Sequence, residues 1–122
     1  MKIMKLEELT VYNMSMGLAD DVWKIVLNWD WFSKDTIGKQ LIRSVVSVAA
    51  NLGEGFGRYH YKDTKNFSYY SRGSLYETKT WISKAYNRKL ITDEEFKHFS
   101  DSIDKIGIKL NNYINSIGKI NK

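Results

Sequence analysis

The sequence predicts an all-α protein that folds as an antiparallel up-down-up-down four-helix bundle. In four separate segments, apolar residues recur at steps of three and four, the spacing of one face of an α-helix. The connections between these segments are short, which favours antiparallel neighbours. The 122 residues fit a single domain, residues 1–122, of a size that buries roughly two thirds of its unfolded surface.

The first helix is expected from about Thr10 to Trp29. Its outer side carries Asp20 and Asp21. The segment from Asp30 to Thr36 then breaks the periodicity with residues that favour turns and N-caps, so we expect it to connect two helices. The inner face of the first helix is expected to hold Tyr12, Met16, Ala19, Trp23, Val26 and Trp29.

The second helix is expected from about Thr36 to Gly57, a glycine that favours a helix end. It carries two stripes. Leu41, Val45, Val48, Leu52 and Phe56 face the core. A polar stripe repeats as regularly, although small polar residues are weaker helix formers than Lys or Glu. We therefore expect a buried or half-buried seam, with ordinary exposure as the alternative, at Gln40, Ser44, Ser47, Asn51, Glu54 and Arg58.

The third helix is expected from Lys62 or Asp63 to about Asn87. Gly73 and Ser74 allow another backbone to approach closely, and Glu77 follows one turn later. A buried carboxylate needs a partner, so we expect Glu77 to share a hydrogen-bonded network with Arg43, unless Glu77 is exposed. The inner residues are expected to be Phe67, Tyr70, Ser74, Leu75, Thr78, Trp81, Ile82 and Ala85.

The fourth helix has the most regular pattern. Thr92 and Glu95 form the sequence signature of a capping box, with Thr92 as the N-cap. The steps of three and four that follow resemble a coiled-coil seam. This seam comprises Phe96, Phe99, Ile103, Ile106, Leu110, Tyr113, Ile117 and Ile120.

Composition excludes several classes of protein. There is no cysteine, which excludes disulfides and thiolate metal sites. The first ten residues carry too many charges for a signal peptide, and no run approaches about 18 apolar residues. We therefore expect a cytoplasmic protein without a membrane span.

Sequence motifs for catalysis or cofactors are weak. Gly53, Gly55 and Gly57 follow a helix and lack both the dinucleotide spacing and a Walker lysine. Glu95 and His98 have the spacing of one half of a di-iron site, but there is only one such pair. The other histidine, His60, lies in a different region. We expect no metal, no cofactor and no enzyme activity.

Positive charge is concentrated in one part of the chain. Residues 62–91 hold seven basic and two acidic side chains, and the net charge of the chain is +5. Such an excess suits a polyanion, although exposed helices also carry it. Basic side chains neutralise phosphates and tyrosines stack on unpaired bases. The candidate nucleic-acid-binding residues are Arg58, Tyr59, Tyr61, Lys62, Lys65, Tyr69, Arg72, Lys79, Arg88 and Lys89.

Aromatic residues exceed what four short helices can hide. An exposed apolar patch usually marks an interface, which predicts a homo-oligomer. Half-buried rings on a monomer are the alternative. The residues that suggest an interface are Trp23, Trp29, Trp31, Phe32, Tyr59, Tyr61, Tyr69 and Tyr76.

Another pattern of residues at fixed spacing comprises Leu9, Val11, Tyr12, Gln40, Arg43, Ser44, Ser47, Asn51, Glu54, Gly55, Arg58, Phe67, Gly73, Ser74 and Glu77. In this pattern the chain resembles a family of small bacterial four-helix-bundle proteins named for the intervening sequence of 23S ribosomal RNA genes. The resemblance implies an antiparallel bundle. Through the similar accessory protein of diversity-generating retroelements, it also implies a pentamer that binds RNA or DNA. A protein-interaction scaffold with no nucleic-acid ligand is the competing interpretation.

Overall fold

The computed structural model of the chain describes residues 4–119, in which helices account for every regular element. The predicted all-α class is therefore confirmed. A 3-10 helix, η1, comes first, and a π-helix, η2, directly precedes α3, the second of the four long helices. In chain order the elements are η1 (Leu6–Glu8), α1 (Thr10–Val26), α2 (Trp31–Ser33), η2 (Lys34–Gly38), α3 (Lys39–Gly55), α4 (Tyr61–Asn87) and α5 (Asp93–Ser116).

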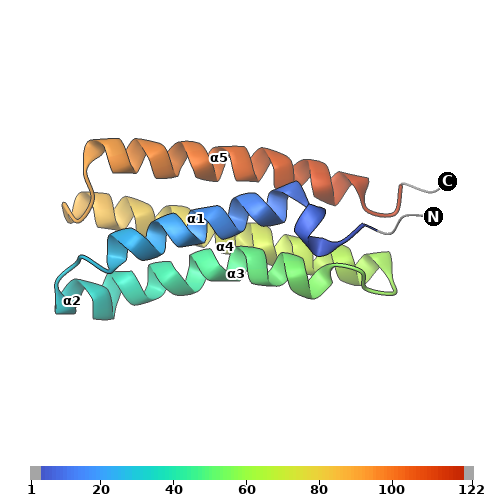
Figure 1. Cartoon of the computed structure of the whole chain (residues 1–122), viewed down its shortest axis with the longest axis horizontal. Coiled ribbons are helices and arrows are strands. Elements are labelled where there is room, and N and C mark those ends of the chain that lie inside the picture. Colours follow the sequence, from blue (N-terminus) through green and yellow to red (C-terminus); the bar gives the residue numbers. More distant parts are fainter. Residues whose placement is uncertain (1–3, 120–122) are drawn as a thin grey trace.

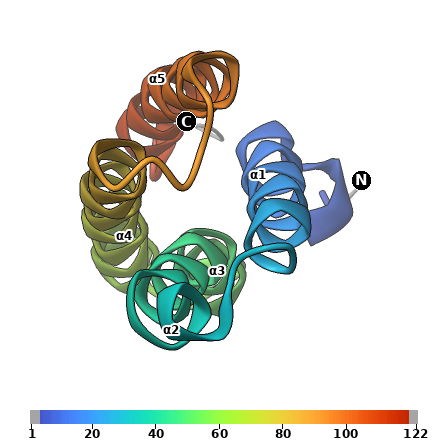
Figure 2. The same cartoon turned by 90° about the vertical axis from the view of Figure 1, so that its left-hand side faces the viewer.

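The four long helices lie side by side, and successive ones run in opposite directions (Figure 1). Viewed along the bundle, α1 lies between α5 and α3, while α4 lies between α3 and α5 (Figure 2). The helix pairs in contact are the same four neighbours. This is the four-helix bundle that the sequence predicts. Its central side chains include Val22, Leu41, Val45, Val48, Leu52, Ile82, Ile106 and Leu110.

The inner face of α1 differs from the predicted one. The helix ends at Val26 instead of Trp29, and both Met16 and Trp23 are exposed. Ser15 is fully buried instead. Its hydroxyl can be buried without remaining unpaired because it donates to the carbonyl oxygen of Val11 at 2.8 Å. The buried residues of α1 are Val11, Ser15, Leu18, Val22 and Val26.

The expected connection from Asp30 to Thr36 is mostly helical, which corrects the prediction. The Asp30 carboxylate accepts hydrogen bonds from the Ser33 main-chain nitrogen at 3.0 Å and from the Ser33 hydroxyl at 2.8 Å. As an N-cap, Asp30 starts α2, and η2 then continues directly into α3. Gly38 lies at a close approach: a Cβ atom there would be 3.0 Å from Cγ1 of Val26.

The buried face of α4 matches the expected one only in part: Leu75, Thr78, Ile82 and Ala85 are buried as predicted. α3 ends at Gly55, and Gly57 follows in a left-handed conformation with φ of 70°. Tyr70 is exposed, while Phe67, Ser74 and Trp81 are only half-buried. Small hydroxyl residues point inward instead, since a hydroxyl that bonds to a nearby carbonyl can be buried without penalty. The buried residues of α4 are Thr64, Ser68, Ser71, Leu75, Thr78, Ile82 and Ala85.

The prediction for α5 is confirmed at its start and along its core face. Thr92 Oγ1 accepts from the main-chain nitrogen of Glu95 at 3.1 Å, and Glu95 Oε1 accepts from that of Thr92 at 2.8 Å, which is a complete capping box. Ile120 lies outside the described residues. Of the expected seam, Phe99, Ile103, Ile106, Leu110 and Ile117 are buried, whereas Phe96 and Tyr113 are half-buried.

Candidate nucleic-acid interface and polar seam

The buried part of the polar seam joins α3 to α4 through hydroxyl groups. Thr78 Oγ1 lies 3.1 Å from Ser44 Oγ and 2.8 Å from the carbonyl oxygen of Ser74. Ser44 in turn donates to the carbonyl oxygen of Leu41 at 3.1 Å. Both Ser44 and Thr78 are buried. Of the expected network, Ser44 and Ser74 therefore contribute to helix packing, together with Thr78.

The Arg43 and Glu77 side chains meet at the surface, not in a buried network. Their closest nitrogen and oxygen atoms are 3.9 Å apart, and the side chains are 71% and 45% exposed. Arg43 Nη2 also donates to Gln40 Oε1 at 2.8 Å, and Trp81 Nε1 donates to Glu77 Oε2 at 3.1 Å. The expectation of a buried pair is wrong because Glu77 lies on the outer side of α4.

The remaining polar-stripe residues bond to residues four positions away in the chain. Ser47 donates to the carbonyl oxygen of Arg43 at 2.8 Å, and Asn51 donates to that of Ser47 at 2.9 Å. Glu54 forms an ion pair of 3.0 Å with Arg58. The seam therefore divides into a buried hydroxyl cluster, an outer ion-pair group and bonds along α3.

Along α4, cations and tyrosines share one largely exposed stripe. Five of its members are among the predicted nucleic-acid-binding residues: Lys62, Lys65, Tyr69, Arg72 and Lys79. Tyr76 belongs there as well, because it lies one heptad after Tyr69 and is exposed. The six residues follow one another at steps of three and four, as the positions of a single helix face do. We call them the α4 stripe: Lys62, Lys65, Tyr69, Arg72, Tyr76 and Lys79.

Arg72 is already held in place within the stripe. Its guanidinium lies 4.9 Å from the centroid of the Tyr69 ring and donates to Asn111 Oδ1 on α5 at 3.0 Å. Beyond Tyr76, the stripe continues into a groove of about 400 Å³ that also contacts Lys84 and Asn87. Lys84 and Asn87 were not in the predicted set. They lie eight and eleven residues after Tyr76, so helical periodicity would have placed them on the same face of α4.

Of the candidate residues just before and at the start of α4, Arg58 is already bound within the chain, whereas the two tyrosines are exposed. Arg58 Nε donates to the carbonyl oxygen of Glu54 at 2.9 Å, and its guanidinium lies 4.8 Å from the centroid of the Phe67 ring. Arg58 therefore closes the end of α3. Tyr59 is exposed beside His60, with ring centroids 4.8 Å apart. Tyr61 is exposed at the start of α4, so Tyr59 and Tyr61 lie at one end of the α4 stripe.

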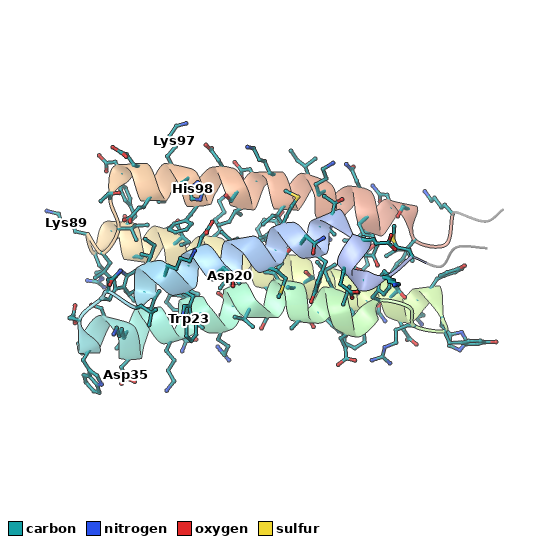
Figure 3. The ribbon with its side chains drawn as sticks, in the orientation of Figure 1. Asp20, Trp23, Asp35, Lys89, Lys97 and His98 are labelled. Atoms are coloured by element: carbon teal, nitrogen blue, oxygen red, sulfur yellow. The ribbon has the colours of Figure 1, made fainter. Side chains whose placement is uncertain are left out.

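Arg88 and Lys89 lie at the opposite end of α4, where they are separated from the other candidates. Lys89 adopts a left-handed conformation with φ of 61° and donates its main-chain N–H to the carbonyl oxygen of Tyr86 at 3.0 Å, so it forms the helix end. The Tyr86 hydroxyl donates to Asp93 at 2.7 Å, and this bond raises the pKa of Tyr86. Figure 3 shows Lys89 at the extreme end of the bundle.

The histidine next to the capping box pairs with a carboxylate of another helix. His98 Nε2 lies 3.4 Å from Asp21 Oδ2, which joins α5 to α1. Over residues 4–119, no cluster of three or more histidine and acidic side chains has the arrangement of a metal site. Nor does any helix in that range have the length and apolar character needed to cross a lipid bilayer.

Known proteins match the chain in both sequence and fold. Residues 7–112 match the family described as 23S rRNA-intervening sequence protein. A solved structure of a protein of unknown function from the S23 ribosomal protein family of Bacteroides thetaiotaomicron VPI-5482 superimposes with a TM-score of 0.77 and 21% identity, over 87% of this chain and 96% of the other. No curated protein matches. The sequence match covers most of the chain, and the chain therefore belongs to the 23S rRNA-intervening sequence protein family.

Proposed function

We propose that this protein is a non-catalytic accessory protein of the cytoplasm that binds nucleic acid along the α4 stripe. The observation that carries the proposal is the alternation of cations and tyrosines on the surface from Lys65 to Lys79, preceded by a further cation at Lys62. Lysine and arginine side chains neutralise phosphates and release counterions, while tyrosine rings accept stacked bases of any sequence.

The dimensions of the stripe suit an unpaired strand. At about 1.5 Å per residue, Lys62 and Lys79 are roughly 26 Å apart along the helix, and Tyr69 and Tyr76 roughly 10 Å. A double helix hides its base faces, so the tyrosines would contribute little to binding a duplex. The family's description refers to 23S rRNA and the structural relative is assigned to a ribosomal protein family, which makes RNA the first ligand to test.

Self-association is the second part of the proposal. Exposed aromatic side chains remain on the surface of the bundle, although Trp29 is buried. A pentamer is the stoichiometry that the family resemblance implies. A ring of subunits would repeat each weak contact with a strand and raise the overall affinity. The exposed aromatic residues are Trp23, Trp31, Phe32, Tyr59, Tyr61, Tyr69, Tyr70 and Tyr76.

A binding titration with matched charge variants tests the nucleic-acid proposal. The stripe variant carries Lys62→Glu, Lys65→Glu and Lys79→Glu. The control carries Lys97→Glu, Lys105→Glu and Lys109→Glu on α5, which changes the net charge by the same amount. Wild type and control should bind single-stranded RNA or DNA, with an affinity that falls steeply as salt rises. The stripe variant should bind at least about tenfold more weakly, with a smaller salt slope.

Two outcomes would decide against this function. If wild type does not bind at low salt, a protein-interaction scaffold without a nucleic-acid ligand takes its place. If both triple variants lose affinity equally, net charge accounts for the binding and the α4 stripe is not the site.

A further inference from the structure

An apolar groove lies between α1 and the helical segment that starts at Trp31. Its volume is about 510 Å³. Figure 3 shows Trp23 projecting from α1 on the side of α3, with Asp35 at the same end of the bundle. The six residues of the α4 stripe do not line this groove, so it is a separate surface. The apolar side chains that line it are Trp23, Val26, Leu27, Trp31 and Ile42.

The walls of the groove are open to solvent. Trp23 and Leu27 are each 54% exposed, and Trp31 is 74% exposed. A pocket for a small molecule encloses most of its ligand, which side chains this exposed do not do. A groove between two antiparallel helices suits the apolar face of a third helix, whose side chains at steps of three and four enter it. Exposed apolar side chains gathered in this way mark an interaction site.

Positive charge predominates around the groove. Lys34, Lys39 and Arg43 line it against a single carboxylate, that of Asp35, so three positive and one negative side chain give a net charge of +2. Within residues 4–119 neither lysine forms an ion pair. Arg43 lies 3.9 Å from Glu77 and stays 71% exposed, so it retains donors for a partner. A rim on which one sign predominates favours a partner of the opposite charge.

Two other occupants fit these observations less well. In a symmetric contact between copies of the chain, the cations of one groove would face those of the other, and like charges at an interface are unfavourable. A nucleic-acid strand would match the charge, but its bases stack on flat aromatic rings. Val26, Leu27 and Ile42 offer no such ring. Aliphatic side chains flanked by carboxylates match both the lining and the rim.

We infer that the groove between α1 and α3 binds an acidic amphipathic helix of another protein. The apolar face of that helix contacts Trp23, Leu27 and Trp31, and its carboxylates pair with Lys34 and Lys39. This contact is independent of the proposed nucleic-acid binding, because the α4 stripe contributes none of the lining.

Two matched libraries of displayed peptides test the inference. Each encodes helices of about 14 residues, or roughly four turns, with varied apolar residues at steps of three and four on one face. The polar face carries Glu and Gln in the first library, and Lys replaces each Glu in the second. Selection on the wild-type protein at low salt should enrich peptides from the acidic library and none from the basic one. Fluorescence anisotropy then measures the affinity of individual labelled peptides.

Three variants locate the site at which the selected peptides bind. Trp23→Ala combined with Trp31→Ala, and Lys34→Glu combined with Lys39→Glu, should each weaken binding at least about tenfold. Asp35→Ala should instead tighten binding by about threefold or more, because it removes the one carboxylate that lines the groove. A damaged fold would not produce such a gain. Circular dichroism checks that each variant is helical.

The controls lie on α5, outside the groove. Lys105→Glu combined with Lys109→Glu changes the net charge by the same amount as the paired lysine variant. Ile108→Ala removes another exposed apolar side chain, since Ile108 is 63% exposed. Both controls should bind the peptides as wild type does.

Several results would overturn the inference. One is the enrichment of no acidic peptide, or equal enrichment from both libraries. Another is a set of peptides that bind the groove variants as tightly as wild type, because their site would lie elsewhere. If Lys34→Glu with Lys39→Glu weakens binding of single-stranded RNA but not of peptides, the groove takes nucleic acid instead.

Native mass spectrometry completes the test. If wild type is an oligomer and Trp23→Ala with Trp31→Ala is a monomer, a second copy covers the groove and the inference fails. If the two have the same oligomeric state, the groove stays available to another protein. The α4 stripe is tested by its own variants, so failure of this inference leaves the proposed nucleic-acid function standing.

Discussion

The hydroxyl of Ser71 in α4 donates a hydrogen bond of 2.6 Å to the main-chain carbonyl oxygen of Val48 in α3. Both residues are fully buried, so water does not compete for the bond. A carbonyl has two lone pairs, which lets Val48 accept this bond in addition to one from its own helix. The small side chain at position 71 therefore both allows the two helices to approach and connects them.

Replacement of Ser71 by alanine should lower the free energy of unfolding by about 0.5–1.5 kcal/mol, the usual net value of one hydrogen bond. Urea denaturation of wild type and variant measures it. The control is Ser83→Ala, because the Ser83 hydroxyl only returns to the carbonyl oxygen of Lys79 in its own helix, at 3.0 Å. That substitution should change the free energy by less than about 0.5 kcal/mol. Equal losses for both would contradict a connecting role for Ser71.

The Arg43–Glu77 pair should contribute little to stability. Because both side chains are largely solvated, Arg43→Ala and Glu77→Ala should each lower the free energy of unfolding by under about 1 kcal/mol. A double-mutant cycle from denaturation curves should give a coupling energy of about 0.5 kcal/mol or less, reduced further by salt. A coupling energy of several kcal/mol would mean that the pair is shielded from water, as in a contact between copies of the chain.

How far the sequence predicted the structure depended on what fills each helix face. In α5 the core positions are large and apolar, and the prediction was correct from Thr92 to Ile117. In α4 the buried face also contains Thr64, Ser68 and Ser71, which were not expected there. A prediction from hydrophobicity places the neighbouring aromatic residues inside the bundle, because the sequence does not reveal which hydroxyl groups find a hydrogen-bond acceptor when they are buried. The face of α1 was misplaced for the same reason at Ser15.

The sequence predicted the spacing of the candidate binding residues along α4, but it did not predict the contacts that their side chains make. The step of seven from Lys65 to Arg72 and on to Lys79 is enough to place these residues on one stripe of a helix. That Arg58 closes α3 and that Arg72 reaches Asn111 depend on which helices are neighbours. The ordering of α2 and η2 also escaped prediction, since it depends on the packing of Gly38 against Val26.

Asp30 should make the stability of the helix start depend on pH. The hydrogen bond from the Ser33 main-chain nitrogen, reinforced by the Ser33 hydroxyl, lowers the pKa of Asp30 below its usual 3.8. A lowered pKa stabilises the fold at all pH values above the unfolded pKa, and this stabilisation is lost as the pH falls through the folded value. The difference in melting temperature between wild type and Asp30→Ala should therefore be largest at neutral pH and should shrink on acidification.

Thermal denaturation between neutral and strongly acidic pH measures this difference. The control is Asp35→Ala, because Asp35 is exposed and the described residues offer it no hydrogen-bond partner. It should differ little from wild type at any pH. A difference for Asp30→Ala that stays constant or grows on acidification would exclude the carboxylate cap as its cause.

Two glycines in the middle helices should respond in opposite ways to alanine. At Gly55 an added Cβ would lie 2.7 Å from Cβ of Phe67 and 3.3 Å from the carbonyl oxygen of Thr64, so α3 or α4 must move. At Gly73 an added Cβ meets no described atom within 4 Å. The close approach that the sequence suggested at Gly73 is therefore located at Gly55 within this chain.

Gly55→Ala should lower the free energy of unfolding by about 1–3 kcal/mol, the usual cost of overpacking. Gly73→Ala should raise it by roughly 0.5–1 kcal/mol, because alanine has the higher helix propensity. Urea denaturation at low protein concentration compares the two variants with wild type. A destabilised Gly73→Ala would show that another backbone covers Gly73, and native mass spectrometry of that variant would reveal whether the backbone belongs to a second copy. If Gly55→Ala leaves the free energy of unfolding unchanged, α3 and α4 can move apart at this contact at less cost than the distances indicate.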